Sequence, residues 1–105
     1  MNIVDSITEL FCKVDDQMRE VPKHSQSKLW PSEIVTLGLL HAIKGVGNRA
    51  FYGWLVDNYL AMFPCLPERT RLFRLLRKHQ AWTRSFLAKP TLLGVVDTYG
   101  IELVH

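Results

Sequence analysis

The segment PSEIVTLGLLHAIKG constrains the fold more than any other, because on a helix it is apolar around most of its circumference. Pro31 suits the first turn, where its missing N–H is not needed, and Ser32 and Glu33 suit the positive end of the helix dipole. Gly45 is placed to end the helix as a left-handed cap. A helix without a polar face must be covered on several sides. We therefore expect this helix to be central, with most of the other elements packed around it.

One helix is expected before this segment and one after it. Ser6 and Glu9 have the S-x-x-E spacing of a capping box, which predicts a helix start, and apolar residues follow at helical spacing: Ile7, Leu10, Phe11, Val14 and Met18. The helix after it is NRAFYGWLVDNYLAMF, with Asn48 as its cap and Pro64 beyond its end. Its aromatic residues are expected to pack in the core rather than stack on nucleotide bases. His41 on the central helix is expected to be a hydrogen-bonded core histidine.

Two shorter helices and an apolar run follow. One helix is predicted from about residue 69 to 79, and the other from about 81 to 88, packing Trp82 and Phe86 and stopped by Pro90. The run TLLGVVD is typical of a strand covered on both faces, and IELV is able to return as a second strand. The fold is therefore predicted to be mainly α: a compact bundle of about five helices followed by a C-terminal β-strand or β-hairpin.

The composition is that of a globular protein without a membrane anchor. Its hydrophobic content of 48% excludes wholesale disorder. No stretch approaches the roughly 20 uninterrupted apolar residues that a membrane span needs, and MNIVDSITELF lacks the basic region and cleavage site of a signal peptide. Cys12 and Cys65 have no CxxC spacing and are expected to be reduced core thiols. A cytoplasmic protein with no membrane partner is predicted.

The charge is distributed unevenly along the chain. Glu68 to Lys89 contains seven basic residues and one acid, whereas the rest has six basic and nine acidic residues. Such an excess on an amphipathic helix favours binding to the phosphate backbone of nucleic acid, because guanidinium groups make two-point contacts with phosphate oxygens. An acidic protein partner and a plain solvated face are the alternatives. The candidate DNA-binding residues are Arg69, Arg71, Arg74, Arg77, Lys78, Arg84 and Lys89.

Asp97 follows the apolar run LLGVV. A carboxylate at the edge of a hydrophobic interior has to be hydrogen-bonded or bound to a cation. One interpretation is a turn residue that bonds to the backbone of Tyr99 or Gly100. The other is a ligand of Mg²⁺, which proteins hold with one or two carboxylates together with phosphate oxygens. This stretch alone favours the turn.

Five stretches, taken in order, resemble the N-terminal part of bacterial insertion-sequence transposases of the DDE class: ITELFCKVDD, PSEIVTLGLLHAIKG, NRAFYGWL, LPERTRLFRLL and LLGVVDTYGIELVH. In that class a helical domain precedes an RNase H-like core, whose first strand ends in the first of three metal-binding carboxylates. Asp97 matches that position, so the resemblance implies that it is a catalytic residue and a Mg²⁺ ligand. It also implies a helical DNA-binding and assembly domain over residues 1–89 and the first strands of an incomplete RNase H-like domain over 90–105.

The second Asp and the Glu of such a core lie well downstream, whereas the sequence continues for eight residues after Asp97. The resemblance therefore predicts a truncated transposase fragment that binds double-stranded DNA at insertion-sequence terminal repeats and is inactive alone. Mg²⁺ is expected only in a complete core. A second copy of the chain, or the remainder of the transposase, is the further partner that the resemblance suggests. Two alternatives stay open: a helical interaction module or inhibitor that associates with a full-length transposase, and a small helix-turn-helix regulator.

Overall fold

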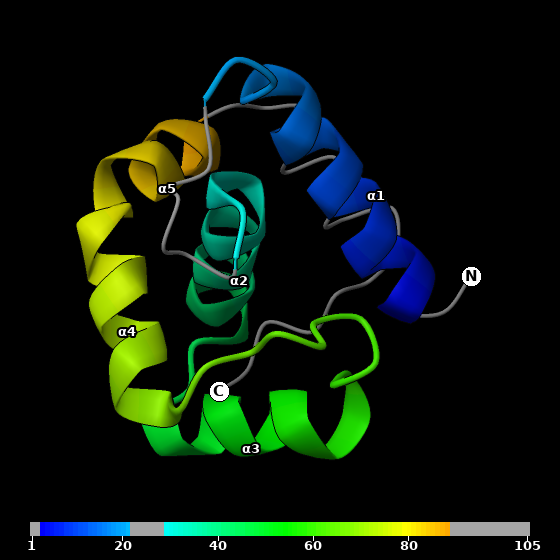
Figure 1. Cartoon of the computed structure of the whole chain (residues 1–105), viewed down its shortest axis with the longest axis vertical. Coiled ribbons are helices and arrows are strands. Elements are labelled where there is room, and N and C mark those ends of the chain that lie inside the picture. Colours follow the sequence, from blue (N-terminus) through cyan, green and yellow to red (C-terminus); the bar gives the residue numbers. More distant parts are fainter. Residues whose placement is uncertain (1–2, 22–28, 89–105) are drawn as a thin grey trace.

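Helix α2, Pro31–Lys44, lies at the centre of the molecule, and the other helices surround it (Figure 1). The computed structural model describes residues 3–21 and 29–88, and within them the chain forms five helices and no strand. Ten of the 14 residues of α2 are buried, so it is covered on several sides. The radius of gyration is 12.8 Å, close to the roughly 13 Å of a compact domain of about 100 residues. The predicted mainly helical bundle and its central helix are confirmed.

Both ends of α2 follow the sequence signals. Pro31 occupies the first position, and Glu33 Oε1 accepts a hydrogen bond of 3.0 Å from the backbone N–H of Trp30. At the other end Gly45 adopts φ 69° and ψ 22°, and its N–H donates to the carbonyl of His41 at 3.1 Å. Glycine adopts this left-handed conformation without a steric penalty. The helix therefore begins and ends where local chemistry predicts.

Helix α1, Ile3–Gln17, lies along one side of α2 (Figure 1) and contributes Ile7, Leu10 and Val14 to the core. The predicted capping box is wrong, because the helix begins before Ser6 and continues through it. Ser6 is fully buried. Its spacing of four residues from Leu10 places both on the face that packs against the rest of the molecule.

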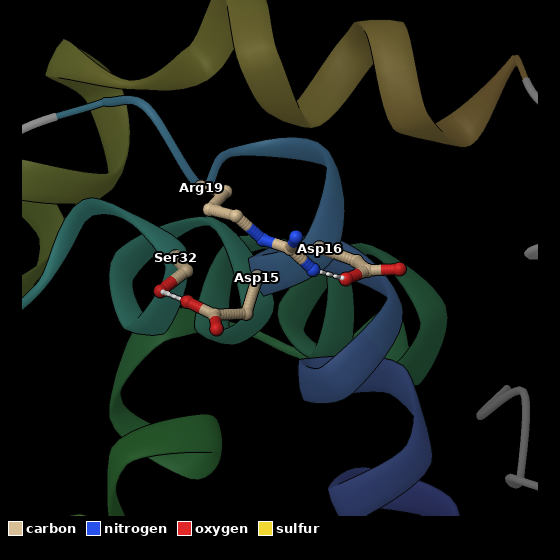
Figure 2. Close-up of polar contacts among 4 residues, drawn as sticks. All are labelled: Asp15, Asp16, Arg19 and Ser32. Carbon is tan, nitrogen blue, oxygen red and sulfur yellow. Dashed lines mark hydrogen bonds and ion pairs between the residues drawn. The ribbon is translucent and has the colours of Figure 1, made fainter.

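A polar contact links the last turns of α1 to the first turn of α2. The buried Ser32 hydroxyl donates a hydrogen bond of 2.8 Å to Asp15 Oδ1 (Figure 2). Beside it, Arg19 and Asp16 form an ion pair at the surface (Figure 2), and exposed pairs of this kind stabilise a fold little. A buried hydroxyl, by contrast, requires a partner. The serine–aspartate bond therefore helps to fix how α1 and α2 meet.

Helix α3, Asn48–Asn58, crosses the end of α2 (Figure 1). It ends earlier than predicted, since residues 59–63 form turns instead of continuing the helix. At its end, the Asn58 side chain donates a hydrogen bond of 2.9 Å to the carbonyl of Trp54. Local bonds of this type are how asparagine competes with the helical backbone. The turns that follow bury Phe63, which is 3% exposed.

Helices α4, Arg69–Lys78, and α5, Gln80–Leu87, cover α2 on the side away from α1 (Figure 1). Both lie within one residue of their predicted bounds at each end. Helix α4 buries Leu72 and Leu76, and α5 buries Phe86.

The contact between α2 and α5 leaves no room for a side chain at Gly38. A Cβ atom there would lie 2.8 Å from Thr83 Oγ1, which is closer than Cβ atoms and oxygens approach in folded proteins. Thr83 is itself buried, at 9% exposure. Glycine at this position therefore sets how closely the two helices pack.

Several predictions fall outside the described residues. These are the C-terminal strand or hairpin, the catalytic-domain range 90–105, Asp97 and Lys89. Over residues 3–21 and 29–88, no helix is both long enough and apolar enough to cross a membrane.

Gly38→Ala is expected to lower the free energy of unfolding by about 1–3 kcal/mol, the usual effect of overpacking a core, although alanine favours a helix interior by roughly 1 kcal/mol. In a Thr83→Ala background the obstructing atoms are gone, so the same change should be neutral or stabilising. Denaturant unfolding of the unchanged protein, the two single variants and the double variant measures the coupling free energy between positions 38 and 83. Additive effects of the two changes would show that this contact does not set the helix spacing.

Candidate nucleic-acid interface

Two adjoining hollows lie along α4. The first, of about 310 Å³, lies between α4 and the start of α3, and the second, of about 350 Å³, lies between α2, α4 and α5. Asn48, Phe73 and Arg77 line both, so the hollows adjoin, and we call the two together the α4 groove. The first hollow is also lined by Arg69, Thr70 and Arg74, and the second by Gly38, His41, Ala42, Leu76, Gln80, Thr83, Arg84 and Leu87.

The basic residues divide into two groups. Arg69, Arg74, Arg77 and Arg84 are exposed and line the α4 groove. Arg71 and Lys78 are exposed as well, but they line neither hollow. Their spacing of seven residues places them together on the outer side of the helix. The structure thus brings four of the predicted DNA-binding residues into one groove and leaves this pair beside it.

The α4 groove is electropositive. None of its described lining residues is acidic, and no described carboxylate forms an ion pair with its arginines. Helices α3 and α4 both begin beside the first hollow, and neither has a side chain that caps its first turn. The partial positive charges at these helix starts add to the charges of the arginines. The arrangement favours anions.

Tyr52 holds the start of α4 against α3. Its hydroxyl donates a hydrogen bond of 2.7 Å to the carbonyl of Pro67, near the end of the segment that connects the two helices. That segment runs back along α3, so both helices begin at the same corner of the molecule (Figure 1). Asn48, the first residue of α3, and Arg69, the first residue of α4, consequently line the same hollow.

His41 lines the second hollow and packs against two aromatic rings. Its ring centroid lies 4.9 Å from that of Phe51 and 5.2 Å from that of Phe73. Burial lowers the pKa of His41 from its ordinary value, and a hydrogen bond with the backbone of Val46 opposes this shift with a smaller effect. Nε2 is enclosed and has no hydrogen-bond partner among the described residues. His41 therefore packs against aromatic rings as expected but is only half-buried, and one of its ring nitrogens lacks the predicted hydrogen bond.

The aromatic residues predicted to pack in the core do so for the most part. Phe51, Tyr59 and Phe63 are buried, at 0%, 9% and 3% exposure. Trp54 is half-buried, and its ring lies 4.8 Å from that of Tyr59 between centroids. These rings fill space between the helices and are not arranged along a surface for nucleotide stacking.

Three residues expected to be buried are exposed instead. Cys12 and Cys65 are free thiols, as predicted, but both lie at the surface. Cys12 falls between the buried positions 10 and 14 on the outward side of α1, and Cys65 belongs to the segment between α3 and α4. Trp82 is 38% exposed and stacks on Phe86. The cysteines were expected to be buried because they are small and apolar, and the tryptophan because it is large and apolar. The helices pack without covering these three side chains.

Sequence reasoning missed three residues of the α4 groove. Asn48 was expected to cap α3, but Gly47 occupies the cap position and Asn48 is the first helical residue. Phe73 lies four residues from both Arg69 and Arg77, a spacing that places all three on one side of α4 and was visible in the sequence. Gln80 reaches the groove through the packing of α5, which no local spacing reveals.

Within the part of the chain that the structure describes, no group of three His, Cys, Asp or Glu side chains is placed to hold a metal ion. Comparison of the chain with protein-family models, with curated proteins and with solved structures gives no match.

The free energy of unfolding is expected to fall as the pH decreases below 6.5, the ordinary pKa of histidine. Because the pKa of His41 is lower in the folded chain, the unfolded chain binds the proton more strongly, and protonation favours unfolding. His41→Phe keeps an aromatic ring and removes the titration. Its stability should therefore change less between about pH 7 and pH 5, as measured by denaturant unfolding. An identical pH dependence of the two proteins would contradict this account.

Proposed function

We propose that this chain binds double-stranded DNA through the α4 groove and the outer side of α4, as the DNA-binding part of a DDE transposase. The observation that carries the proposal is the gathering of Arg69, Arg74, Arg77 and Arg84 in one groove without a described carboxylate among them. Guanidinium groups held together repel one another unless an anion lies between them. Backbone phosphates are such anions, and they match the two-point geometry of guanidinium.

Arg71 and Lys78 extend the proposed contact around α4. Both are exposed and lie outside the groove. A DNA strand that follows α4 meets the groove arginines on one side of the helix and this pair on the other. Contacts to phosphates position a protein on the duplex without reading its sequence. The affinity is therefore expected to depend strongly on salt and weakly on base sequence.

The assignment to a transposase rests on the sequence resemblance described above. In a complete RNase H-like core, Asp97 would be the first of the three carboxylates that hold Mg²⁺, and the ions would activate the nucleophile and stabilise the phosphoryl transition state. The other two carboxylates would come from outside residues 1–105. The DNA bound by the helical domain would then be the terminal repeats of the element, and a second copy of the chain or the remainder of the transposase would complete the assembly.

The logarithm of the affinity for a short duplex is expected to fall with the logarithm of the salt concentration at a slope of about −3 to −5, since each phosphate contact contributes roughly −0.9. Replacing Arg74 and Arg77 together by alanine removes two contacts and should flatten the slope by about two units. Fluorescence anisotropy with labelled duplex at several salt concentrations gives these slopes.

The matched control is the double replacement of Lys13 and Arg19 by alanine. These exposed residues carry the same total charge but belong to α1 and the turn after it, and they line neither hollow. Equal flattening by both pairs would mean that overall charge, not the α4 groove, drives binding. No binding at low salt would overturn the DNA proposal and favour an acidic protein partner. Asp97→Asn should leave binding unchanged.

A further inference from the structure

The α4 groove has two chemically different parts. The first hollow is mainly cationic, with Arg69, Arg74 and Arg77 in its wall. The second has a buried or half-buried apolar floor that includes Phe73 and Leu76. Its exposed rim carries side chains with hydrogen-bond donors, Gln80 and Arg84. The two parts meet at Phe73 and Arg77, which line both.

Paired DNA offers phosphates to the arginines of both parts, but it has nothing that matches the apolar floor of the second. In a duplex the bases are stacked on their neighbours, so a protein surface meets phosphates and base edges but no base face. A nucleotide without a pairing partner presents a phosphate together with a planar, largely apolar base that has a hydrogen-bonding edge. This combination matches a cationic hollow that adjoins an apolar one.

We propose that the second hollow binds the base of a single unpaired nucleotide that adjoins the duplex; this rests on the DNA binding proposed above. Phe73 is half-buried and lines the hollow, and its ring packs against those of His41 and Phe51. It is the aromatic surface on which the base stacks. Gln80 bonds to the edge of the base, and Arg84 beside it remains a phosphate contact. Arg77, shared by the two hollows, binds the phosphate that joins the unpaired nucleotide to the duplex.

The dimensions and the polar groups define what is bound. A volume of about 350 Å³ lies near the lower limit of small-molecule sites, roughly 300–1,000 Å³, so the hollow takes one nucleotide and not a run of them. The amide of Gln80 both donates and accepts hydrogen bonds, and every base has a face that stacks on an aromatic ring. The site is therefore tolerant of base identity.

The test compares three labelled DNAs at low salt by fluorescence anisotropy: a blunt duplex, the same duplex with a one-nucleotide extension, and the same duplex with an abasic one-nucleotide extension of equal charge. The difference between the last two isolates the contribution of the base. The extension with a base is expected to bind about five- to 160-fold more tightly than the abasic one, the range that stacking of one base on an aromatic side chain gives.

Two tryptophan variants locate the site. Ala42 is an exposed residue of α2 that lines the second hollow, so Ala42→Trp fills it and should abolish the advantage of the extension with a base over the abasic one. Ala81 is an exposed residue of α5 that lines neither hollow, and Ala81→Trp should leave this advantage and the affinity for blunt duplex unchanged.

Gln80→Ala is a change at an exposed position that leaves the hollow open. It should reduce the advantage of the base-containing extension several-fold. If Ala42→Trp does not fold, this variant decides whether the base binds in the second hollow.

The outcomes separate this proposal from the one on which it rests. Blunt-duplex binding with equal affinity for the base-containing and abasic extensions overturns the nucleotide site and leaves the DNA-binding proposal intact. An advantage that persists in Ala42→Trp and in Gln80→Ala overturns the site as well, because the base then binds elsewhere. Absence of binding to all three DNAs overturns both proposals.

Discussion

A helix with no polar face cannot lie at the surface, and the need to cover α2 organises the whole molecule. Burying a leucine or isoleucine side chain stabilises a fold by about 1.5–3 kcal/mol, and α2 supplies such residues around most of its circumference. Helix α1 covers one side of it, α4 and α5 cover another, and α3 crosses its end (Figure 1). Each covering helix then has its outward face free for other chemistry.

The basic surface follows from this arrangement. Helix α4 covers α2 with a narrow apolar stripe in which only Leu72 and Leu76 are buried, so most of its circumference is available for arginine and lysine. The connection from α3, held by the bond between Tyr52 and Pro67, returns the chain to the corner where α3 begins. Two helices that start at one corner and diverge leave a hollow between them, and the arginines of α4 line it.

Features set by a few neighbouring residues were predictable from the sequence, whereas those set by packing were not. Pro31 and Gly45 bound α2 because their backbone preferences act locally. The start of α1 was misjudged because Ser6 is equally suited to a cap and to a small buried position, and only the packing decides between them. The end of α3 was misjudged because aromatic residues in turns reach the core as readily as those on a helix, and Phe63 is buried without being helical.

The same distinction applies to the candidate site. The basic face could be predicted because its periodicity belongs to a single helix. The groove could not, since it combines Asn48 of α3, His41 of α2 and Gln80 of α5 with side chains of α4. These residues are separated in the sequence and meet only through the order in which the helices surround α2.

Among the described residues, the groove arginines have no acidic lining neighbour and no ion pair, and this also affects the protein in the absence of DNA. In the unfolded chain these guanidinium groups are farther apart and fully hydrated, so folding brings like charges together and is opposed by their repulsion. A multivalent anion in the groove relieves that repulsion only in the folded state. The fold should therefore respond to the kind of anion in the buffer as well as to ionic strength: sulfate or phosphate would stabilise it by occupying the groove, whereas chloride would act mainly by screening.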